Sequence, residues 1–357
     1  MKISILLPYK ENFSSEYAGA VSLQLKDTTN LSKFKKNIKI FGSTTFKQNI
    51  LKNNYVNLST RKLFFQSRSN VYIKNFLHYE KKKFSDLIEI HNRPNYIKYI
   101  YETNKNIVLY FHNNPLDIKG SKTIRERNEL LKKVKKIIFI SNWTKNQFLK
   151  GINKLIIKNN QLEVISHSTN KKIISFKNKK KIILFVGRLN KSKGYDIFGS
   201  SITELLDKFP NWRAIVIGDE PREKHFFKHK NLKILGFQKQ SVVSKYFIDA
   251  DISVVCSRWN EPFGRTALEA SSSGCAVIIT NRGGLPEASP YAIKINKLNS
   301  LSLKSTISKI ITNSKFKKNL QKKIYKNFKL TNELITKKVD KYRARLIKYW
   351  FYLVRCF

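Results

Sequence analysis

The sequence predicts an α/β protein of two domains, each built around a parallel β-sheet. Short and almost continuous apolar runs, typical of strands buried on both faces, alternate with stretches of helical periodicity. The 357 residues suit about two domains, and 41% hydrophobic residues are enough to build their cores. A lysine-rich segment, Lys171–Lys181, separates two similar sets of runs. Because ligands bind beyond the carboxyl ends of parallel strands, two facing sheets would place a binding cleft between the domains.

The first set of runs belongs to a predicted N-terminal domain over residues 1–170. Two helical stretches in it, Thr123–Val134 and Trp143–Lys150, are long enough to connect one parallel strand to the next. The predicted strands are Ile3–Leu7, Ile38–Phe41, Leu63–Phe65, Leu87–His91, Ile107–Phe111, Ile137–Ser141 and Leu162–Ser166.

Residues 171–181 are expected to form a linker, because the segment holds six lysines and no glycine. A second α/β domain is predicted over residues 182–330, with helices at Ile197–Phe209, Ser241–Ile248 and Arg265–Ser272. Its predicted strands are Ile182–Val186, Ala214–Ile217, Lys233–Leu235, Ile252–Cys256, Ala276–Thr280 and Ala292–Ile295.

The last part of the chain is strongly basic and helical. From Lys315 to Phe357 there are 14 Lys and Arg but only two acids. An apolar stripe at Phe316, Leu320, Ile324 and Phe328 is expected to pack onto the second domain. For the final amphipathic helix, residues 331–357, two alternatives stay open: it crosses back to the N-terminal domain, or its basic aromatic face contacts an anionic membrane. Its stripe is Tyr342, Leu346, Tyr349, Trp350, Leu353 and Phe357.

The net charge of +46 suggests nucleic-acid binding at first sight. However, Lys, Asn and Ile are frequent along the whole chain, which indicates a compositional background rather than one basic face, so no nucleic-acid partner is expected. Apolar runs are too short for a transmembrane helix, and Pro8 and Lys10 interrupt any signal peptide. We therefore expect a cytoplasmic protein, either free or peripheral on the inner face of the cytoplasmic membrane.

The first chemical motif follows the predicted strand Ile182–Val186. The segment from Gly187 to Gly194 turns into a helix and carries two cations, Arg188 and Lys193. Glycine permits a tight turn, and the amides at a helix start favour anions. This motif is a plausible cradle for a diphosphate, although a solvated turn is an equally simple interpretation.

The second motif follows the predicted strand Ile252–Cys256. Two glutamates eight positions apart, Glu261 and Glu269, flank a Pro-Phe-Gly turn that opens a helix, so both can face a ligand at the helix start. Carboxylates suit sugar hydroxyls because each accepts two or more hydrogen bonds. Backbone amides that could meet an anion here are those of Gly264, Arg265 and Thr266.

The region from Leu184 to Glu287 resembles the donor-binding half of retaining glycosyltransferase family 4. The resemblance rests on these motifs within the following segments, which occur in the family's order: FVGRLNKSKG, IGD, LGF, DADISVVCSRWNEPFGRTALEASSSGCAVI and NRGGLPE. The resemblance implies the GT-B fold, in which two Rossmann-like domains face each other across a cleft. It also implies that residues 182–330 bind a nucleotide sugar and residues 1–170 bind the acceptor.

The resemblance assigns roles to individual residues of the second domain. Arg188 and Lys193 would bind the diphosphate, Glu269 would hold the ribose, and Glu261 would contact the donor sugar and take part in catalysis. The loop of Phe263, Gly264, Arg265 and Thr266 would meet the sugar and phosphates through its amides. The family usually has an aliphatic residue where this chain has Arg265, and we expect its side chain to face solvent, with a phosphate contact as the alternative.

The N-terminal half resembles the family less closely. Gly19 stands where the family has a glycine-rich loop near the donor phosphate. His112 ends a buried strand and corresponds to the family's active-site histidine, which makes it a candidate catalytic residue; a structural histidine is the alternative. His91 ends another strand and is a candidate on the acceptor side. His167 replaces a usual Asn-Gly turn without an evident reason.

No metal site or cofactor is expected. Asp249 and Asp251 have the spacing that binds a metal in other glycosyltransferases, but they directly precede a buried strand. His225 and His229 have helical spacing among lysines, without the glutamate of a zinc-protease motif. Cysteines 256, 275 and 356 support neither a disulfide framework nor zinc.

The resemblance implies a metal-independent, retaining transfer of a sugar from a nucleotide sugar to a glycan or lipid-linked acceptor, as in lipopolysaccharide or surface-polysaccharide assembly. Cations at the leaving diphosphate would stabilise its growing charge. The alternative is a catalytically silent basic protein of the same fold that holds a polyanion.

Overall fold

The computed structural model describes residues 1–17, 19–46, 50–61 and 66–355, with side chains up to residue 347. The predicted strand Leu63–Phe65 therefore lies outside the described residues, as do Phe357 and the side chains of Tyr349, Trp350 and Leu353. Two compact units divide the chain: Met1–His167 with Asn332–Phe357 form unit 1, and Ser168–Thr331 form unit 2.

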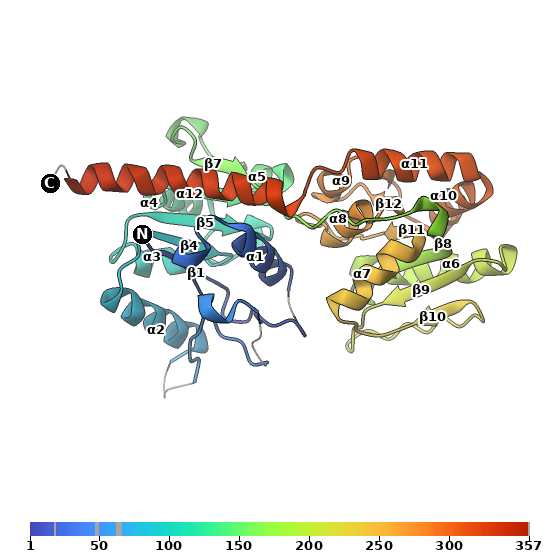
Figure 1. Ribbon diagram of the computed structural model, residues 1–357, viewed down its shortest axis with the longest axis horizontal. Coiled ribbons are helices and arrows are strands. Elements are labelled where there is room, and N and C mark those ends of the chain that lie inside the picture. Colours follow the sequence, from blue (N-terminus) through green and yellow to red (C-terminus); the bar gives the residue numbers. More distant parts are fainter. Residues whose placement is uncertain (18, 47–49, 62–65, 356–357) are drawn as a thin grey trace. The chain divides into compact units, whose positions relative to one another are not determined.

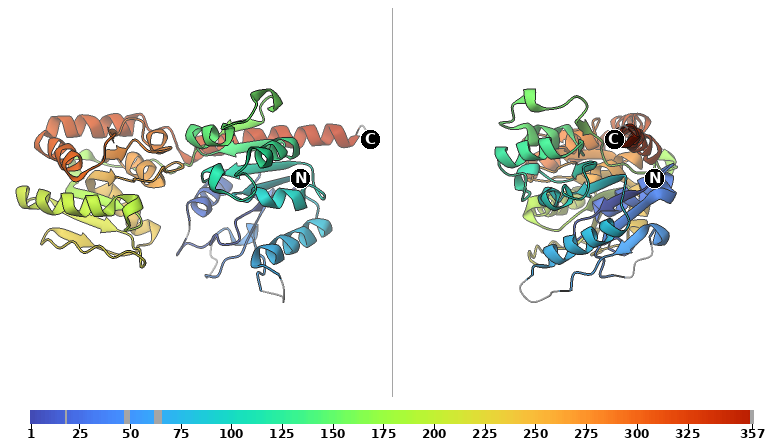
Figure 2. Two further views of the ribbon diagram at one scale, coloured as in Figure 1. Left: turned by 180° about the vertical axis from the view of Figure 1, so that it is seen from behind. Right: turned by 90° about the vertical axis from the view of Figure 1, so that its left-hand side faces the viewer.

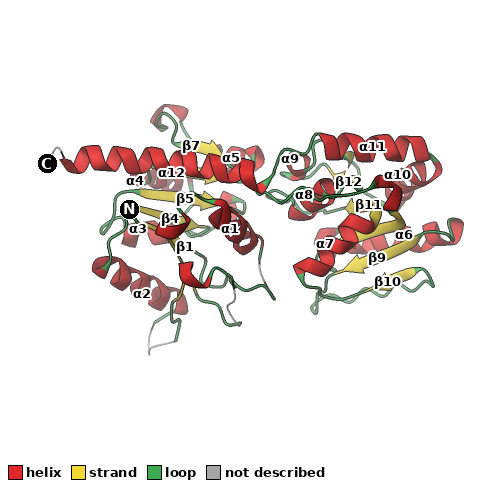
Figure 3. Ribbon diagram, in the orientation of Figure 1, coloured by secondary structure: helices red, strands yellow, loops and turns green. Residues whose placement is uncertain are grey.

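Unit 1 contains a parallel sheet in the order β3-β2-β1-β4-β5-β6-β7. Its central strands are buried along their whole length, because helices cover both faces (Figure 3). The strands are β1 (Ile3–Leu6), β2 (Ile38–Gly42), β3 (Tyr55–Asn57), β4 (Leu87–His91), β5 (Ile107–Phe111), β6 (Lys136–Phe139) and β7 (Leu162–Val164). The helices are α1 (Ala20–Leu31), α2 (Arg68–Lys82), α3 (Ile97–Ile100), α4 (Ile124–Lys133), α5 (Asn142–Leu149) and α12 (Asn332–Arg355).

Unit 2 contains a second parallel sheet in the order β10-β9-β8-β11-β12-β13. The strands are β8 (Lys180–Val186), β9 (Arg213–Ile217), β10 (Leu232–Ile234), β11 (Ala250–Val255), β12 (Ala276–Thr280) and β13 (Ile293–Ile295). The helices are α6 (Tyr195–Lys208), α7 (Gln240–Asp249), α8 (Arg265–Ser272), α9 (Leu285–Ala288), α10 (Ser300–Thr312) and α11 (Ser314–Lys326). Since β8 and β11 are paired and parallel, the loops that follow them emerge at the same edge of the sheet.

Helix boundaries follow local capping chemistry. Thr123 and Glu126 form a reciprocal capping box at the start of α4, and Ser141 with Thr144 does the same for α5. These caps explain why both predicted helices in the N-terminal half are present with nearly the predicted boundaries.

The segment predicted to be a linker, Lys171–Lys181, is instead part of unit 2. Its backbone and lysines are bound to neighbouring elements: Lys172 N donates to Ser272 O at 3.0 Å, and Lys179 Nζ donates to Ser273 O at 2.6 Å. The last lysines of the segment begin β8. The lysine-rich composition suggested a linker, and four of the six lysines are indeed exposed, but the backbone at Lys172 and the side chain of Lys179 are held by unit 2.

The C-terminal helix α12 packs on unit 1 along α1 and β4 (Figures 1 and 2). Buried Arg343 donates to both carboxylate oxygens of Glu89 in β4, at 2.7 and 2.8 Å. Asp340 accepts from Ser32 Oγ at 2.6 Å, just beyond the end of α1. The chain thus returns to unit 1, one of the two alternatives for this helix. On α11, by contrast, Leu320 and Ile324 are buried in unit 2.

Among the described residues, no helix is both long enough and apolar enough to cross a membrane.

Candidate active site

Glycine-containing loops lie close together at the carboxyl edge of the unit 2 sheet. Gly187 N, after β8, donates to Ile217 O at 3.0 Å, and Gly218 N, after β9, donates to Gly236 O at 2.9 Å. Gly218 has φ 137°, and a Cβ there would lie 1.8 Å from Gly187 O. The two loops therefore approach so closely that a side chain at position 218 would not fit between them.

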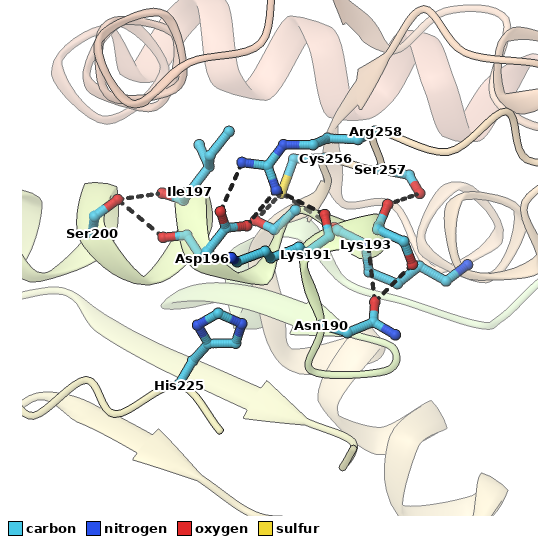
Figure 4. Close-up of polar contacts among 12 residues, drawn as sticks. Asn190, Lys191, Lys193, Asp196, Ile197, Ser200, His225, Cys256, Ser257 and Arg258 are labelled. Atoms are coloured by element: carbon cyan, nitrogen blue, oxygen red, sulfur yellow. Dashed lines mark hydrogen bonds and ion pairs between the residues drawn. The ribbon is translucent and has the colours of Figure 1, made fainter. Parts of the chain in front are cut away.

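The loop between β8 and α6 is held rigidly before it reaches Lys193 (Figure 4). Asn190 Oδ1 accepts from Lys193 N at 3.1 Å, and Asn190 Nδ2 donates to Glu220 Oε2 at 3.2 Å. Hydrogen bonds from Arg222 lower the pKa of Glu220 to about 2, so this carboxylate is charged at neutral pH. Arg188 is exposed on the same loop, and no ion pair joins it to another described residue.

Contacts with the loop after β11 fix the other side of this turn. Ser192 O accepts from Arg258 N at 2.9 Å and from Trp259 N at 3.1 Å. The Arg258 side chain donates to both carboxylate oxygens of Asp196 at 2.5 and 2.7 Å (Figure 4). Burial raises the pKa of the neighbouring Cys256 thiol to about 12, so this cysteine is not a nucleophile at neutral pH.

Lys193, predicted to bind the diphosphate, and Glu261, predicted to bind the donor sugar, are in direct contact. Lys193 Nζ forms an ion pair with Glu261 Oε1, which also accepts from Ser257 Oγ at 2.9 Å. The Glu261 side chain is 9% exposed and that of Lys193 is 20% exposed. Lys193 Nζ also lies 5.3 Å from the ring centroid of Trp259. The cation is therefore partly desolvated, which strengthens its interaction with an anion.

The start of α8 holds the second glutamate. Gly264 precedes this helix with φ 109°, and a Cβ there would lie 2.4 Å from Leu285 Cδ2. Phe263 is buried next to it, and Thr266 Oγ1 donates to Val186 O at 3.4 Å. The helix therefore starts directly beside the end of β8.

Arg265 does not face solvent, contrary to the prediction. Its side chain is 14% exposed, and its Nε donates to Glu269 Oε1 at 2.8 Å, one helical turn further along α8. The i,i+4 spacing brings the two side chains to the same face of the helix. Gln240 Nε2 donates to the same oxygen at 3.0 Å. Arg265 Nη1 is buried without a partner among the described atoms. Both Arg265 and Gln240 thus orient Glu269.

In unit 1 the candidate residues lie at the carboxyl ends of β4 and β5. His91 Nδ1 and His112 Nε2 share a hydrogen bond of 2.8 Å, so the acceptor-side candidate and the catalytic candidate are in contact. His112 Nδ1 and His167 Nε2 share another, of 2.9 Å. His112 N also donates to Asn92 Oδ1 at 2.7 Å. Both ring nitrogens of His112 are therefore already bound to other histidines.

Gly19 caps α1 next to a partly buried carboxylate that the sequence did not reveal. A Cβ at Gly19 would lie 2.4 Å from Glu11 Oε1, which accepts from Ser22 N at 3.1 Å and from Ser22 Oγ at 2.8 Å. Burial raises the pKa of Glu11. A side chain at position 19 would have to displace the carboxylate of Glu11.

The rival metal motifs are occupied by other contacts. Asp251 accepts from Lys317 Nζ at 2.6 Å and Asp249 pairs with Lys180 at 2.7 Å, both at the amino end of β11, away from Lys193 and Glu261. His229 contacts Asp207 at 3.1 Å. Within the described part of the chain, no three His, Cys, Asp or Glu residues are grouped in a way that could hold a metal ion.

The chain is similar to known glycosyltransferases in sequence and in fold. Residues 166–327 match the family model of the group 1 glycosyl transferases. A putative glycosyltransferase of Bacillus subtilis, YtcC, is 26% identical, over 68% of this chain and 67% of that protein. A 2-deoxystreptamine N-acetyl-D-glucosaminyltransferase of Niallia circulans is 37% identical, over 29% of this chain and 28% of that protein.

Solved structures match almost the whole chain. Anabaena HepE in complex with UDP and glucose aligns with a TM-score of 0.73 at 16% identity, covering 96% of this chain and 99% of that one. Sucrose-phosphate synthase of Thermosynechococcus elongatus aligns with a TM-score of 0.77 at 16% identity, covering 98% and 100%. The predicted fold class is confirmed: two Rossmann-like units with parallel sheets, as in GT-B glycosyltransferases.

Proposed function

We propose that this glycosyltransferase, which has the GT-B fold and a group 1 domain at residues 166–327, moves a sugar from a nucleotide sugar to a hydroxyl of a glycan or lipid-linked acceptor with retention of configuration. The observation that carries the proposal is the pair of Lys193 and Glu261 at the carboxyl edge of the unit 2 sheet, one cation and one carboxylate in contact. The cation suits a diphosphate, and the carboxylate suits sugar hydroxyls because it accepts their hydrogen bonds.

Binding of the donor would exchange the partners of this pair. The diphosphate competes for Lys193 Nζ, and Glu261 is then free to accept hydrogen bonds from the sugar. Glu269, whose Oε1 is held by Arg265 and Gln240, keeps Oε2 for the ribose hydroxyls. The amides at the start of α8 and the exposed Arg188 add positive potential around the phosphates.

In the transfer step the bond between the sugar and the diphosphate oxygen breaks, and the acceptor hydroxyl forms the new bond on the same face. The hydroxyl proton passes to the leaving phosphate. Lys193 stabilises the charge that grows on this phosphate and needs no reorganisation, because its loop is already fixed by Asn190. No step in this scheme requires a metal ion, and His112 is the candidate catalytic residue of unit 1.

A donor panel tests the proposed function. Purified protein incubated with UDP-, GDP- and ADP-sugars is expected to release nucleotide diphosphate from one of them, and Glu269→Ala is expected to abolish this release by removing the ribose contact. Release without added divalent metal, in the presence of a chelator, tests the metal-independent step. The absence of release from every donor, or equal release by the variant, would contradict the site. UDP is the first donor to test, because Anabaena HepE is seen with UDP and glucose.

The acceptor is proposed to be a lipid-linked or surface glycan, as in lipopolysaccharide or surface-polysaccharide assembly, with the enzyme on the inner face of the cytoplasmic membrane. Support comes from α12. Lys337, Lys341 and Arg345 are exposed along one row of this helix. With Lys33 and the two acids Glu333 and Asp340, they line a cavity of about 670 Å³ beside half-exposed Leu31. Basic residues with apolar neighbours are typical of surfaces that contact anionic lipid.

Flotation with vesicles of phosphatidylglycerol and phosphatidylcholine tests this contact. Replacing Lys337, Lys341 and Arg345 by Glu is expected to weaken binding by about 100-fold or more, because each basic residue near an anionic surface contributes about 1 kcal/mol. The matched control replaces Lys315, Lys318 and Lys322 of α11, which are equally exposed and give the same change in charge. Equal losses in both triple variants would mean that only net charge matters, which would refute a specific surface on α12.

A further inference from the structure

Three of the six histidines in the chain form a continuous hydrogen-bonded row inside unit 1. His91 at the end of β4, His112 after β5 and His167 after β7 are 1%, 6% and 4% exposed. The hydrogen bonds between them are 2.8 and 2.9 Å long. The row is supported at one end by Tyr110, whose ring stacks on His91 at 4.3 Å between centroids.

The surroundings of His91 and His112 favour the uncharged form of both rings. Burial, with the nearby Arg343 cation, lowers the pKa of His91 to about 3, and burial with His91 lowers the pKa of His112 well below 6.5. The charged and titratable groups that face the row are the paired Glu89 of β4 and Arg343 of α12, together with the hydroxyls of Tyr110 and Tyr342. A neutral imidazole has one donor nitrogen and one acceptor nitrogen, so each ring must donate at one side and accept at the other.

Both hydrogen bonds within the row can form in two ways, with every N–H donating either toward His91 or toward His167. The environment of His91, at one end of the row, favours one of these two directions. His91 Nε2 is buried and has no partner among the described atoms. If the row ran toward His91, this nitrogen would carry a buried N–H with no acceptor. If the hydrogen bonds donate away from His91, Nε2 of His91 carries no hydrogen and has only an unpaired acceptor lone pair. Buried N–H groups without a partner are the rarer and costlier defect.

We infer that the row holds His112 in one tautomer, with His91 Nδ1–H donating to His112 Nε2 and His112 Nδ1–H donating to His167 Nε2. His167, which accepts the Nδ1 proton, is the positioning residue that fixes this tautomer. The role of His112 at the sugar rests on the proposed function, but the tautomer does not. In this tautomer Nε2 of His112 is an acceptor. A sugar hydroxyl that replaced His91 would therefore donate its proton to His112, and could not receive one from it.

Nitrogen NMR of protein labelled with ¹⁵N-histidine reads the tautomers directly and needs no substrate. With only six histidines, single substitutions assign every signal. Between about pH 8 and pH 5, His112 is expected to stay neutral with its proton on Nδ1, while an ordinary histidine takes up a second proton near pH 6.5. A proton on Nε2 of His112, or protonation of His112 near pH 6.5, would overturn the inference.

A matched pair of variants separates positioning from packing. His91→Phe keeps an aromatic ring against Tyr110 and leaves the bond to His167, so His112 is expected to keep the single Nδ1–H tautomer. His167→Phe removes the acceptor of that proton. The row then carries one unpartnered N–H in either direction, on His112 Nδ1 or on His91 Nε2, so a mixture of both tautomers of His112 is expected. A single unchanged tautomer in His167→Phe would refute the role of His167. If a variant lost donor turnover without a change in the tautomer of His112, that result would concern the proposed function and would not affect the inference about the tautomer.

Discussion

Replacing Arg343 by Met is expected to destabilise unit 1 by about 3–5 kcal/mol, the usual cost of removing one partner of a buried ion pair. Arg343 and Glu89 are 1% and 0% exposed, and the guanidinium binds both oxygens of the carboxylate. Tyr342 OH also donates to Glu89. Without Arg343 the carboxylate would remain buried with too few donors, and the contact between α12 and β4 would be lost.

Hydrogen exchange measured by mass spectrometry checks this result separately in each unit. Peptides from β4 and α12 are expected to lose protection in Arg343→Met, while peptides from β11 in unit 2 keep theirs. Arg345→Met, on the exposed side of the same helix, is the control and should change stability by less than about 0.5 kcal/mol. Unchanged protection of β4 in Arg343→Met would show that the buried pair does not hold α12 in place.

Replacing Lys193 by Ala is expected to lower the turnover of the accepted donor by about 10²–10³-fold, the effect typical of removing one preorganised group that stabilises developing charge. Lys193 is a partly buried cation of the site, and its backbone is fixed by Asn190. Its removal also leaves Glu261 buried without its ion-pair partner. Steady-state rates of nucleotide release measure the effect.

The control for this variant is Lys191→Ala, in the same turn. Lys191 is exposed, and its described contacts are made by its backbone, so truncation of its side chain should alter turnover by no more than a few-fold. If both variants lost the same activity, the effect would come from the general charge of the loop. If neither did, Lys193 would not be the diphosphate ligand.

The parts of the fold that follow from local patterns could be predicted. Buried parallel strands such as Ile107–Phe111 are continuous apolar runs, and all thirteen described strands except β3 coincide with predicted runs. The spacing of Glu261 and Glu269 around a Pro-Phe-Gly turn likewise depends on neighbours in sequence. The helix start between the two glutamates follows from this spacing, and α8 does begin at Arg265.

The rest depends on contacts between distant residues, which a single sequence does not reveal. Gln240 and Arg265 meet at Glu269 from two helices, and the three histidines of unit 1 meet from three strand ends. Each histidine had a separate interpretation from its local sequence. The charge of +46 was equally uninformative about position, because Arg265 and Arg343 are among its 70 cations and are buried in ion pairs.

Calorimetric titration of UDP and GDP into the full chain tests the central claim most directly, namely that unit 2 binds a nucleoside diphosphate at Lys193. One site per chain is predicted for one of the two nucleotides, weakened at least about 10-fold by Lys193→Ala, because a charge-assisted hydrogen bond contributes about 1.5–3 kcal/mol. Lys191→Ala should bind like the wild type. Binding of neither nucleotide, or equal affinity in Lys193→Ala, would contradict the account.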